Sequence, residues 1–122
     1  MRIRKLAFLL LALVLLLGLA TPVLAHARLL RSLPADGSHL PDPPKQLRLV
    51  FNSLVETRFG RFSLRPETGP AIALALPDPK TRVTRELVLP LPPLDPGRYT
   101  VSWSVVARDS HRVEGTLTFT VD

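Results

Sequence analysis

Large apolar residues alternate with polar ones in the C-terminal part of the chain. In residues 98–106 the apolar residues Tyr99, Val101, Trp103 and Val105 occupy every second position. Residues 116–121 repeat the pattern, and the apolar positions, separated by threonines, are Leu117, Phe119 and Val121. Because successive side chains of a β-strand point to opposite faces, both segments are predicted to be strands that bury one face.

Shorter segments of the same kind lie upstream. Residues 47–51, 61–65, 71–76 and 83–89 are predicted as further strands. Their inward apolar positions are expected to include Leu47, Leu49, Phe51, Phe62, Leu64, Val83, Leu87 and Leu89. Short segments that combine proline with aspartate mark turns at 34–37, 41–44, 77–80 and 94–97. About seven short strands without a helical period predict an all-β fold, an antiparallel two-sheet sandwich.

The start of the longest predicted strand carries a further signal of the fold. Residues 95–99 place a Pro-Gly turn shortly before Tyr99. This arrangement resembles the tyrosine corner of Greek-key sandwiches, in which the tyrosine hydroxyl bonds back to nearby backbone. We therefore assign Tyr99 and Trp103 to the core, and not to a platform that stacks on glycans or bases.

Residues 1–25 have the three parts of a secretory signal peptide: a basic start, an apolar run and a small-residue exit. Cleavage after them leaves residues 26–122 as one mature domain with His26 at its amino terminus. Two alternatives stay open. A cut after Ala27 would discard that histidine, and no cut would leave the apolar run as a membrane anchor. With cleavage before His26, we expect a periplasmic protein that has no stable membrane anchor.

Charge and the absence of sulfur narrow the chemistry of the mature domain. The net charge is +6, and loss of the three basic residues of the leader lowers it to +3. The remaining basic residues are scattered singly, so no nucleic-acid partner is expected. The chain has no cysteine, and Met1 is its only methionine. A metal site must therefore use imidazole, carboxylate, amine and carbonyl ligands, which favour Cu(II), Ni(II) or Zn(II) over Cu(I).

Two segments supply donors for such a site. A mature amino terminus at His26 offers an imidazole and an α-amine that can chelate one ion. Asp109 and His111 flank a single serine, and in an extended segment residues i and i+2 project to the same side. Together these groups give three nitrogens and one oxygen, an arrangement that Cu(II) prefers. A Cu(II) site on these residues is our leading hypothesis. A chance histidine after the leader and an ordinary polar loop are the alternatives.

Two other residues are weaker candidates for metal binding. His39 lies in a predicted turn without a partner at a recognisable spacing, so we interpret it as a surface residue. Glu56 follows the predicted strand 47–51, and surface charge is its simplest explanation. A secondary metal contact is the alternative for both. No hydrolase motif or phosphate-binding glycine loop is present in the sequence.

Five motifs along the mature chain form a set: His26, 32–37, 49–51 with 55–56, 94–103, and an Asp-x-His-x-x-x-Gly run at 109–115. Together they resemble the CopC family of periplasmic copper-binding proteins. The resemblance implies an immunoglobulin-like sandwich with one Cu(II) site on His26, Asp109 and His111. It also implies a copper carrier or buffer in copper homeostasis or resistance, with no enzymatic activity. A CopD-like inner-membrane copper transport protein is the partner that it suggests.

The chain departs from the family pattern at three points. Residues 51–53 read Phe-Asn-Ser, where family members often have a glutamate near the copper. Ala107 stands where the family often has a serine. No methionine remains after the leader, so the methionine-rich Cu(I) site of some members cannot form. One Cu(II) site and no Cu(I) site are therefore expected.

Two functions from other classes stay open. An amine with two imidazoles resembles the histidine brace of copper oxygenases, which would make the protein an oxidative enzyme. A metal-free, immunoglobulin-like adhesion module is the other alternative, and it predicts no saturable copper binding.

Overall fold

The computed structural model describes residues 2–18, 27–76 and 82–122, which form one helix and seven strands. The elements are α1 (Arg2–Leu17), β1 (Leu29–Leu33), β2 (Ser38–Leu40), β3 (Gln46–Pro66), β4 (Ile72–Leu74), β5 (Val83–Pro90), β6 (Gly97–Ala107) and β7 (Arg112–Val121). Among the described residues, no helix is both long and apolar enough to span a bilayer. The predicted cleavage point after residue 25 lies outside the described residues.

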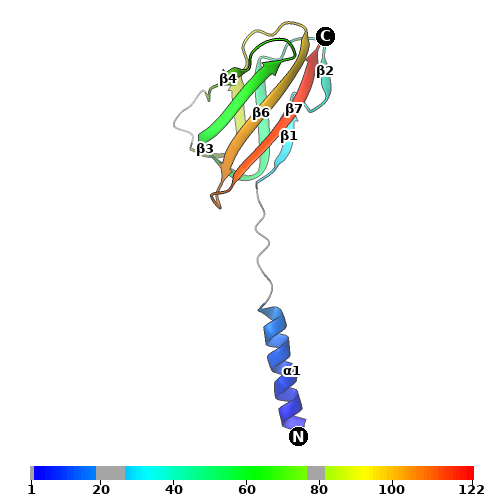
Figure 1. The fold of residues 1–122 in the computed structure, drawn as a ribbon, viewed down its shortest axis with the longest axis vertical. Coiled ribbons are helices and arrows are strands. Elements are labelled where there is room, and N and C mark those ends of the chain that lie inside the picture. The colour runs from blue at the N-terminus through cyan, green and yellow to red at the C-terminus, as the bar shows by residue number, and fades with distance from the viewer. Residues whose placement is uncertain (1, 19–26, 77–81) are drawn as a thin grey trace.

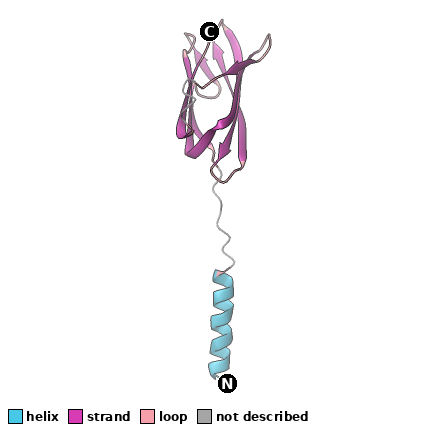
Figure 2. Ribbon diagram, turned by 90° about the vertical axis from the view of Figure 1, so that its left-hand side faces the viewer, coloured by secondary structure: helices cyan, strands magenta, loops and turns pink. Residues whose placement is uncertain are grey.

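One long strand joins the two layers of a sandwich. Strand β3 has 21 residues; its first part pairs with β1 and β5, and its later part pairs with β4 and β6. The strand order is β1-β3-β6-β7-β2, with β4 and β5 also attached to β3. Figure 1 shows β6 between β3 and β7, and Figure 2 shows the layers from the side. The prediction of an all-β sandwich with about seven strands is confirmed.

Strand β2 is the exception to the antiparallel pairing of the described strands, because it runs parallel to β7. The turn before it is fixed against β7. Gly37 N–H donates to the carbonyl of Thr118 at 2.7 Å, and Thr118 N–H donates to Asp36 Oδ1 at 2.9 Å. The chain therefore leaves this turn in the direction of β7. The expectation of purely antiparallel sheets is wrong at this edge, and the predicted turn around His39 is a short strand.

The predicted apolar faces form the core. The predicted inward positions that are buried are Leu47, Leu49, Phe51, Phe62, Leu64, Leu87, Leu89, Tyr99, Val101, Trp103, Val105, Leu117, Phe119 and Val121. Phe51 and Trp103 meet edge to face, with 5.3 Å between the ring centroids. Tyr99 and Phe119 stack, with 5.5 Å between theirs. Such pairs contribute about 0.5–1.5 kcal/mol beyond their buried area. The prediction that Val83 faces the core is wrong. Val83 is 44% exposed at the start of β5, after an irregularity in the β3–β5 ladder.

The start of β6 has the geometry of a tyrosine corner. The Tyr99 hydroxyl donates to the Asp95 carbonyl at 2.6 Å. Gly97 lies between them with φ 148°, a conformation that residues with a Cβ rarely adopt. The predicted corner is therefore confirmed, and both Tyr99 and Trp103 belong to the core.

The strands predicted at 47–51 and 61–65 are two parts of β3. The register of β3 shifts against β5 between Val50 and Val55, and against β6 a few residues later. The apolar alternation is lost over these irregularities, which is why the sequence pattern showed two strands. The weak strand predicted at 71–76 is confirmed as the shorter β4. The turn predicted at 77–80 lies outside the described residues.

Candidate metal centre

The turn between β6 and β7 carries two of the predicted ligands. Ser110 N–H donates to the Ala107 carbonyl at 3.0 Å, and Ala107 N–H donates to the His111 carbonyl at 2.8 Å. Ser110 has φ 69°, in the left-handed region. A turn that ends in a left-handed residue is a common way to close a short β-hairpin. The turn is therefore tightly hydrogen-bonded, and the extended conformation expected for this segment is wrong.

The turn nevertheless brings Asp109 and His111 into contact. Asp109 Oδ1 accepts the backbone N–H of His111 at 3.1 Å, and Oδ2 lies 3.1 Å from Nδ1 of the imidazole. The carboxylate side chain is 21% exposed and the imidazole side chain 62%. A carboxylate beside an imidazole can bind the same ion, or it can orient the ring and set which nitrogen carries the proton. The donor set therefore fits a borderline divalent metal such as Cu(II).

The chain enters β1 at the same end of the sandwich as this turn (Figure 1). Ala27 is 2% exposed and packs in the core. Arg28 is paired with Asn52 of β3 by two hydrogen bonds. Strand β3 continues from there to the residue that pairs with Ala107, at the base of the turn. His26 lies outside the described residues, so its role as a ligand stays a prediction.

Among the described residues, no three histidine, aspartate or glutamate side chains lie close enough together to hold a metal ion. Two of the three predicted ligands are in contact, and the third is outside the described residues. Glu56 lies in β3 opposite Val106, half-buried, and forms no such group with the turn. A secondary metal contact by Glu56 therefore has no support from the described residues.

His39 lies far from the turn, beside the C-terminal end of β7. Its side chain is 70% exposed, and Nδ1 lies 3.5 Å from Asp122 Oδ1. The interpretation of His39 as a surface residue agrees with this position. Its carboxylate neighbour could not be identified from spacing, because the two residues meet only through the parallel β2–β7 pair.

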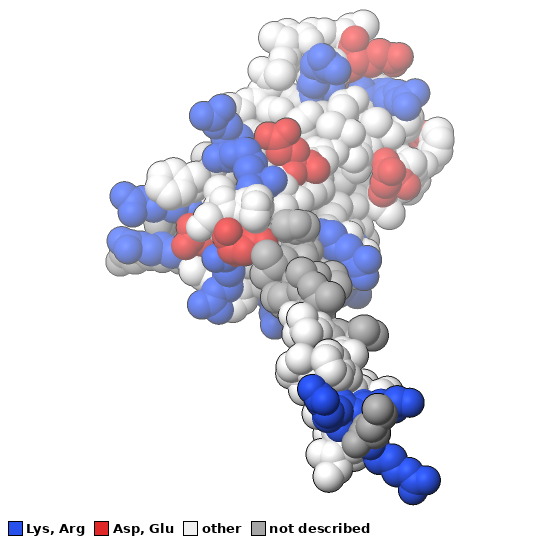
Figure 3. Space-filling model, turned by 60° about the horizontal axis from the view of Figure 1, so that its bottom comes forward, with Lys and Arg blue, Asp and Glu red and all other residues white. Residues whose placement is uncertain are grey.

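Charged residues of both signs surround the end that carries the turn. Arg112 Nη1 donates to Ser104 Oγ at 2.7 Å and to the Phe59 carbonyl at 3.2 Å. The guanidinium carbon of Arg58 lies 5.4 Å from the centroid of the Phe59 ring. Figure 3 turns this end toward the reader, and acidic side chains lie between the basic ones. The mixed charge on this face agrees with a solvated surface.

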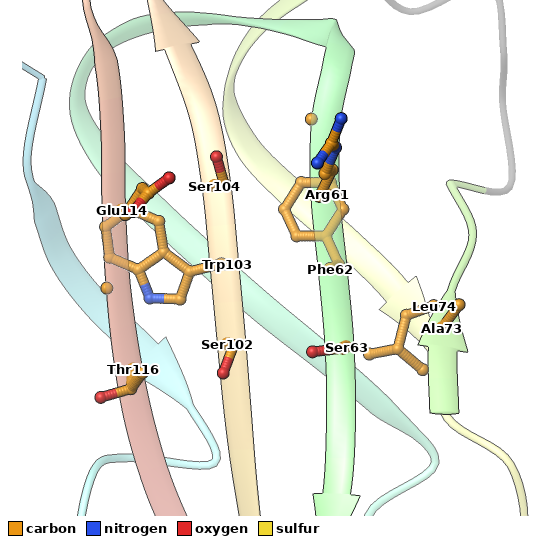
Figure 4. Close-up of a pocket in the computed structure, with 12 residues that line it drawn as sticks. Arg61, Phe62, Ser63, Ala73, Leu74, Ser102, Trp103, Ser104, Glu114 and Thr116 are labelled. Carbon is orange, nitrogen blue, oxygen red and sulfur yellow. The ribbon is translucent and has the colours of Figure 1, made fainter. Parts of the chain in front are cut away.

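An open hollow of about 860 Å³ lies over β3, β6 and β7, next to β4 (Figure 4). Its lining includes Arg61, Phe62, Trp103 and Glu114. Neither of the candidate ligands of the β6–β7 turn lines it.

Comparison with known proteins identifies the family. Residues 29–122 match the CopC domain. Copper resistance protein C from Pseudomonas syringae pv. tomato is 35% identical over 107 residues, which cover 80% of this chain and 81% of that protein. Protein YobA from Escherichia coli (strain K12) is 34% identical over 106 residues, which cover 85% of this chain and 86% of that protein.

Solved structures agree with this assignment. CopC from Methylosinus trichosporium OB3b matches with a TM-score of 0.69 at 33% identity, over 80% of this chain and 94% of that one. PcoC, a methionine-rich copper resistance protein from Escherichia coli, matches with a TM-score of 0.64 at 28% identity, over 80% of this chain and 100% of that one. The resemblance inferred from the sequence motifs is confirmed, and the chain belongs to the CopC family.

Proposed function

We propose that the protein is an exported copper carrier or buffer, which binds one Cu(II) ion through His26, Asp109 and His111 and serves copper homeostasis or resistance. The observation that carries the proposal is the carboxylate–imidazole contact of 3.1 Å in the β6–β7 turn. This contact lies at the end of the sandwich where the chain enters β1, directly after Arg28. The names of two relatives, both copper resistance proteins, support the same direction.

The chemistry of the site follows from its donors. The α-amine and imidazole of a terminal His26 form a chelate ring on one ion. Asp109 and His111 approach from the turn, whose hydrogen bonds limit the movement of both side chains. Three nitrogens and one oxygen suit the tetragonal preference of Cu(II). Because these ligands must be deprotonated to bind, copper affinity should fall at low pH.

The same proposal includes export and processing. Removal of residues 1–25 as a signal peptide exposes the amine of His26 and leaves the mature domain in the periplasm without an anchor. The oxidising conditions of that compartment favour Cu(II) over Cu(I). Delivery to a CopD-like copper transport protein of the inner membrane would complete the pathway.

A second, Cu(I) site is not part of the proposal. Thioether sulfur is the soft ligand that selects Cu(I) in sites of this kind. Met1 is the only methionine, and it leaves with the leader. The protein therefore differs from PcoC, which is described as methionine-rich.

A Cu(II) titration of two processed proteins tests the proposal. One begins at His26, and the other carries a glycine inserted between Ala25 and His26. We expect tight binding and a nitrogen-rich tetragonal electron paramagnetic resonance spectrum for the first protein only. His111→Ala should lose most of the affinity, whereas His39→Ala, the matched histidine control, should not. Equal binding by both processed proteins would remove the terminal amine from the site.

The two alternative functions predict different results. A histidine-brace enzyme should consume ascorbate and produce peroxide or oxidised glycan well above free copper. A metal-free adhesion module should show no saturable Cu(II) binding.

A further inference from the structure

The arm that leads into β1, residues 27–28, is held at Arg28 by the side chain and the backbone of Asn52. Arg28 N–H donates to Asn52 Oδ1 at 2.8 Å, and Asn52 N–H donates to the Arg28 carbonyl at 3.0 Å. The two bonds extend the β1–β3 ladder beyond the pair formed by Leu29 and Phe51. The amide side chain replaces a backbone carbonyl as the acceptor, so Arg28 is fixed at both its N–H and its C=O.

Asn52 lies where β3 changes partners. The register of β3 against β5 shifts between Val50 and Val55, so the residues between them are not part of a regular β3–β5 ladder. Ser53 Oγ donates to Asn52 Oδ1 at 3.4 Å, and Arg85 Nη1 lies 3.5 Å from the Asn52 carbonyl. These neighbours add to the orientation of the amide.

The arm and the turn share β3 as a common support. Ala27, the residue before Arg28, is 2% exposed and packs in the core. Further along β3, Val55 pairs with Ala107, whose N–H donates to the His111 carbonyl at 2.8 Å. With about 3.3 Å per residue of strand, Asn52 lies about 10 Å along β3 from that pair.

We propose that Asn52 is the positioning residue of the copper site: by holding Arg28, two residues after His26, it limits the positions that the amino terminus must search before copper binds. The inference rests on the proposed function, in which His26 is a ligand. A ligand on a free arm must be ordered when the metal binds, and this ordering weakens binding. A hydrogen-bonded pair formed before copper arrives removes much of that loss. The neutral Asn52 then has a role in the segment where the glutamate of the family pattern is missing.

Asn52→Ala tests the inference, with the full-length chain exported and processed as in the wild type. We expect Cu(II) affinity to fall about tenfold, because the Arg28 N–H then loses its acceptor and the metal must supply part of the ordering of the arm. The electron paramagnetic resonance spectrum should lose part of its nitrogen character. Asn52→Asp keeps the Oδ1 acceptor, and it should restore the nitrogen-rich spectrum.

Asp36→Ala is the matched control. Asp36 Oδ1 accepts the N–H of Thr118 at 2.9 Å, which is also a side-chain-to-backbone bond between distant parts of the chain. Thr118 lies near the end of β7 that is remote from the β6–β7 turn. A loss of stability alone should affect both variants, whereas only Asn52→Ala should change the copper spectrum.

Hydrogen exchange of the Arg28 amide in the metal-free protein gives a second readout. Exchange should accelerate in Asn52→Ala and stay unchanged in Asp36→Ala. If the wild type binds Cu(II) and Asn52→Ala gives the same affinity and spectrum, the positioning role is overturned while the proposed function stands. If the wild type does not bind Cu(II), the proposed function fails, and the role of Asn52 toward copper fails with it. Unchanged exchange at Arg28 in Asn52→Ala would overturn the hydrogen-bonded pair itself.

Discussion

Replacement of Gly115 by alanine tests the packing behind the last position of the Asp-x-His-x-x-x-Gly motif. Gly115 pairs with Trp103 across the β6–β7 ladder, and the tryptophan ring extends from β6 over β7 (Figure 4). A Cβ at this position would lie 2.3 Å from Cζ2 and 2.7 Å from Cε2 of the ring. The ring also packs edge to face against Phe51, so it cannot move without disturbing that contact. The glycine is therefore required by the core, and no metal contact is needed to explain it.

The magnitude follows from two opposing effects. Overpacking a core destabilises a protein by about 1–3 kcal/mol. Replacing a glycine inside a strand by alanine offsets about 0.5–1 kcal/mol of this, because the unfolded chain becomes less flexible. We expect a net loss of about 1–2 kcal/mol in the free energy of unfolding for Gly115→Ala. In a domain of this size, that loss lowers Tm by about 5–15 °C.

Chemical and thermal denaturation followed by circular dichroism measure the loss. Thr116→Ala is the matched control at the neighbouring exposed position, and it should change the free energy of unfolding by less than about 1 kcal/mol. Gly115→Ala should lower the free energy of unfolding less in a Trp103→Leu background than in the wild type, because the clash with the tryptophan ring is then absent. The reasoning is refuted if Gly115→Ala is as stable as the wild type, or if its effect is the same in both backgrounds.

Three further changes have defined outcomes. Tyr99→Phe removes the 2.6 Å bond to the Asp95 carbonyl and should lower the free energy of unfolding by about 1 kcal/mol in urea titrations; an unchanged midpoint would argue against the tyrosine corner. Ser110→Gly relieves the backbone at φ 69° and should raise Tm in calorimetry by an amount that corresponds to about 0.5–1 kcal/mol; a lower Tm would contradict this. Asp109→Asn keeps an oxygen that can accept the His111 N–H but removes the carboxylate, so Cu(II) affinity should fall about tenfold or more in a competition titration. Unchanged affinity would exclude the carboxylate from the site.

Alternation in the sequence predicted the central strands well, because burial of one face is a local property. Phe119 and Val121 of β7 face the core as the pattern indicates. Two edge strands, β1 and β2, were not predicted in this way. Strand β2 has only Ser38–Leu40, and it exists because the turn before it bonds to the backbone of β7. Val83 shows the opposite error, since an apolar residue at an irregular strand end remains exposed.

In the candidate site, too, contacts between residues close in sequence could be predicted, whereas contacts between residues far apart in sequence could not. The Asp-x-His motif predicted that Asp109 and His111 meet, and they do, with 3.1 Å between carboxylate and imidazole. They meet through a tight turn and not through an extended segment as expected. The turn depends on the left-handed backbone of Ser110, and a serine in the sequence does not predict that conformation. The pairing of Arg28 with Asn52 joins a residue just before β1 to one of β3, 24 positions along the chain, so only the structure could show it.

The long strand β3 has a consequence for how the domain unfolds. Because β1, β4, β5 and β6 all pair with β3, neither layer can open far without disturbing the strand that the other layer needs. Opening is therefore expected to be cooperative, with similar protection factors in both layers. A metal that binds at one end of such a unit stabilises the whole of it by mass action. Copper loading should accordingly slow proteolysis even at cleavage sites remote from the β6–β7 turn.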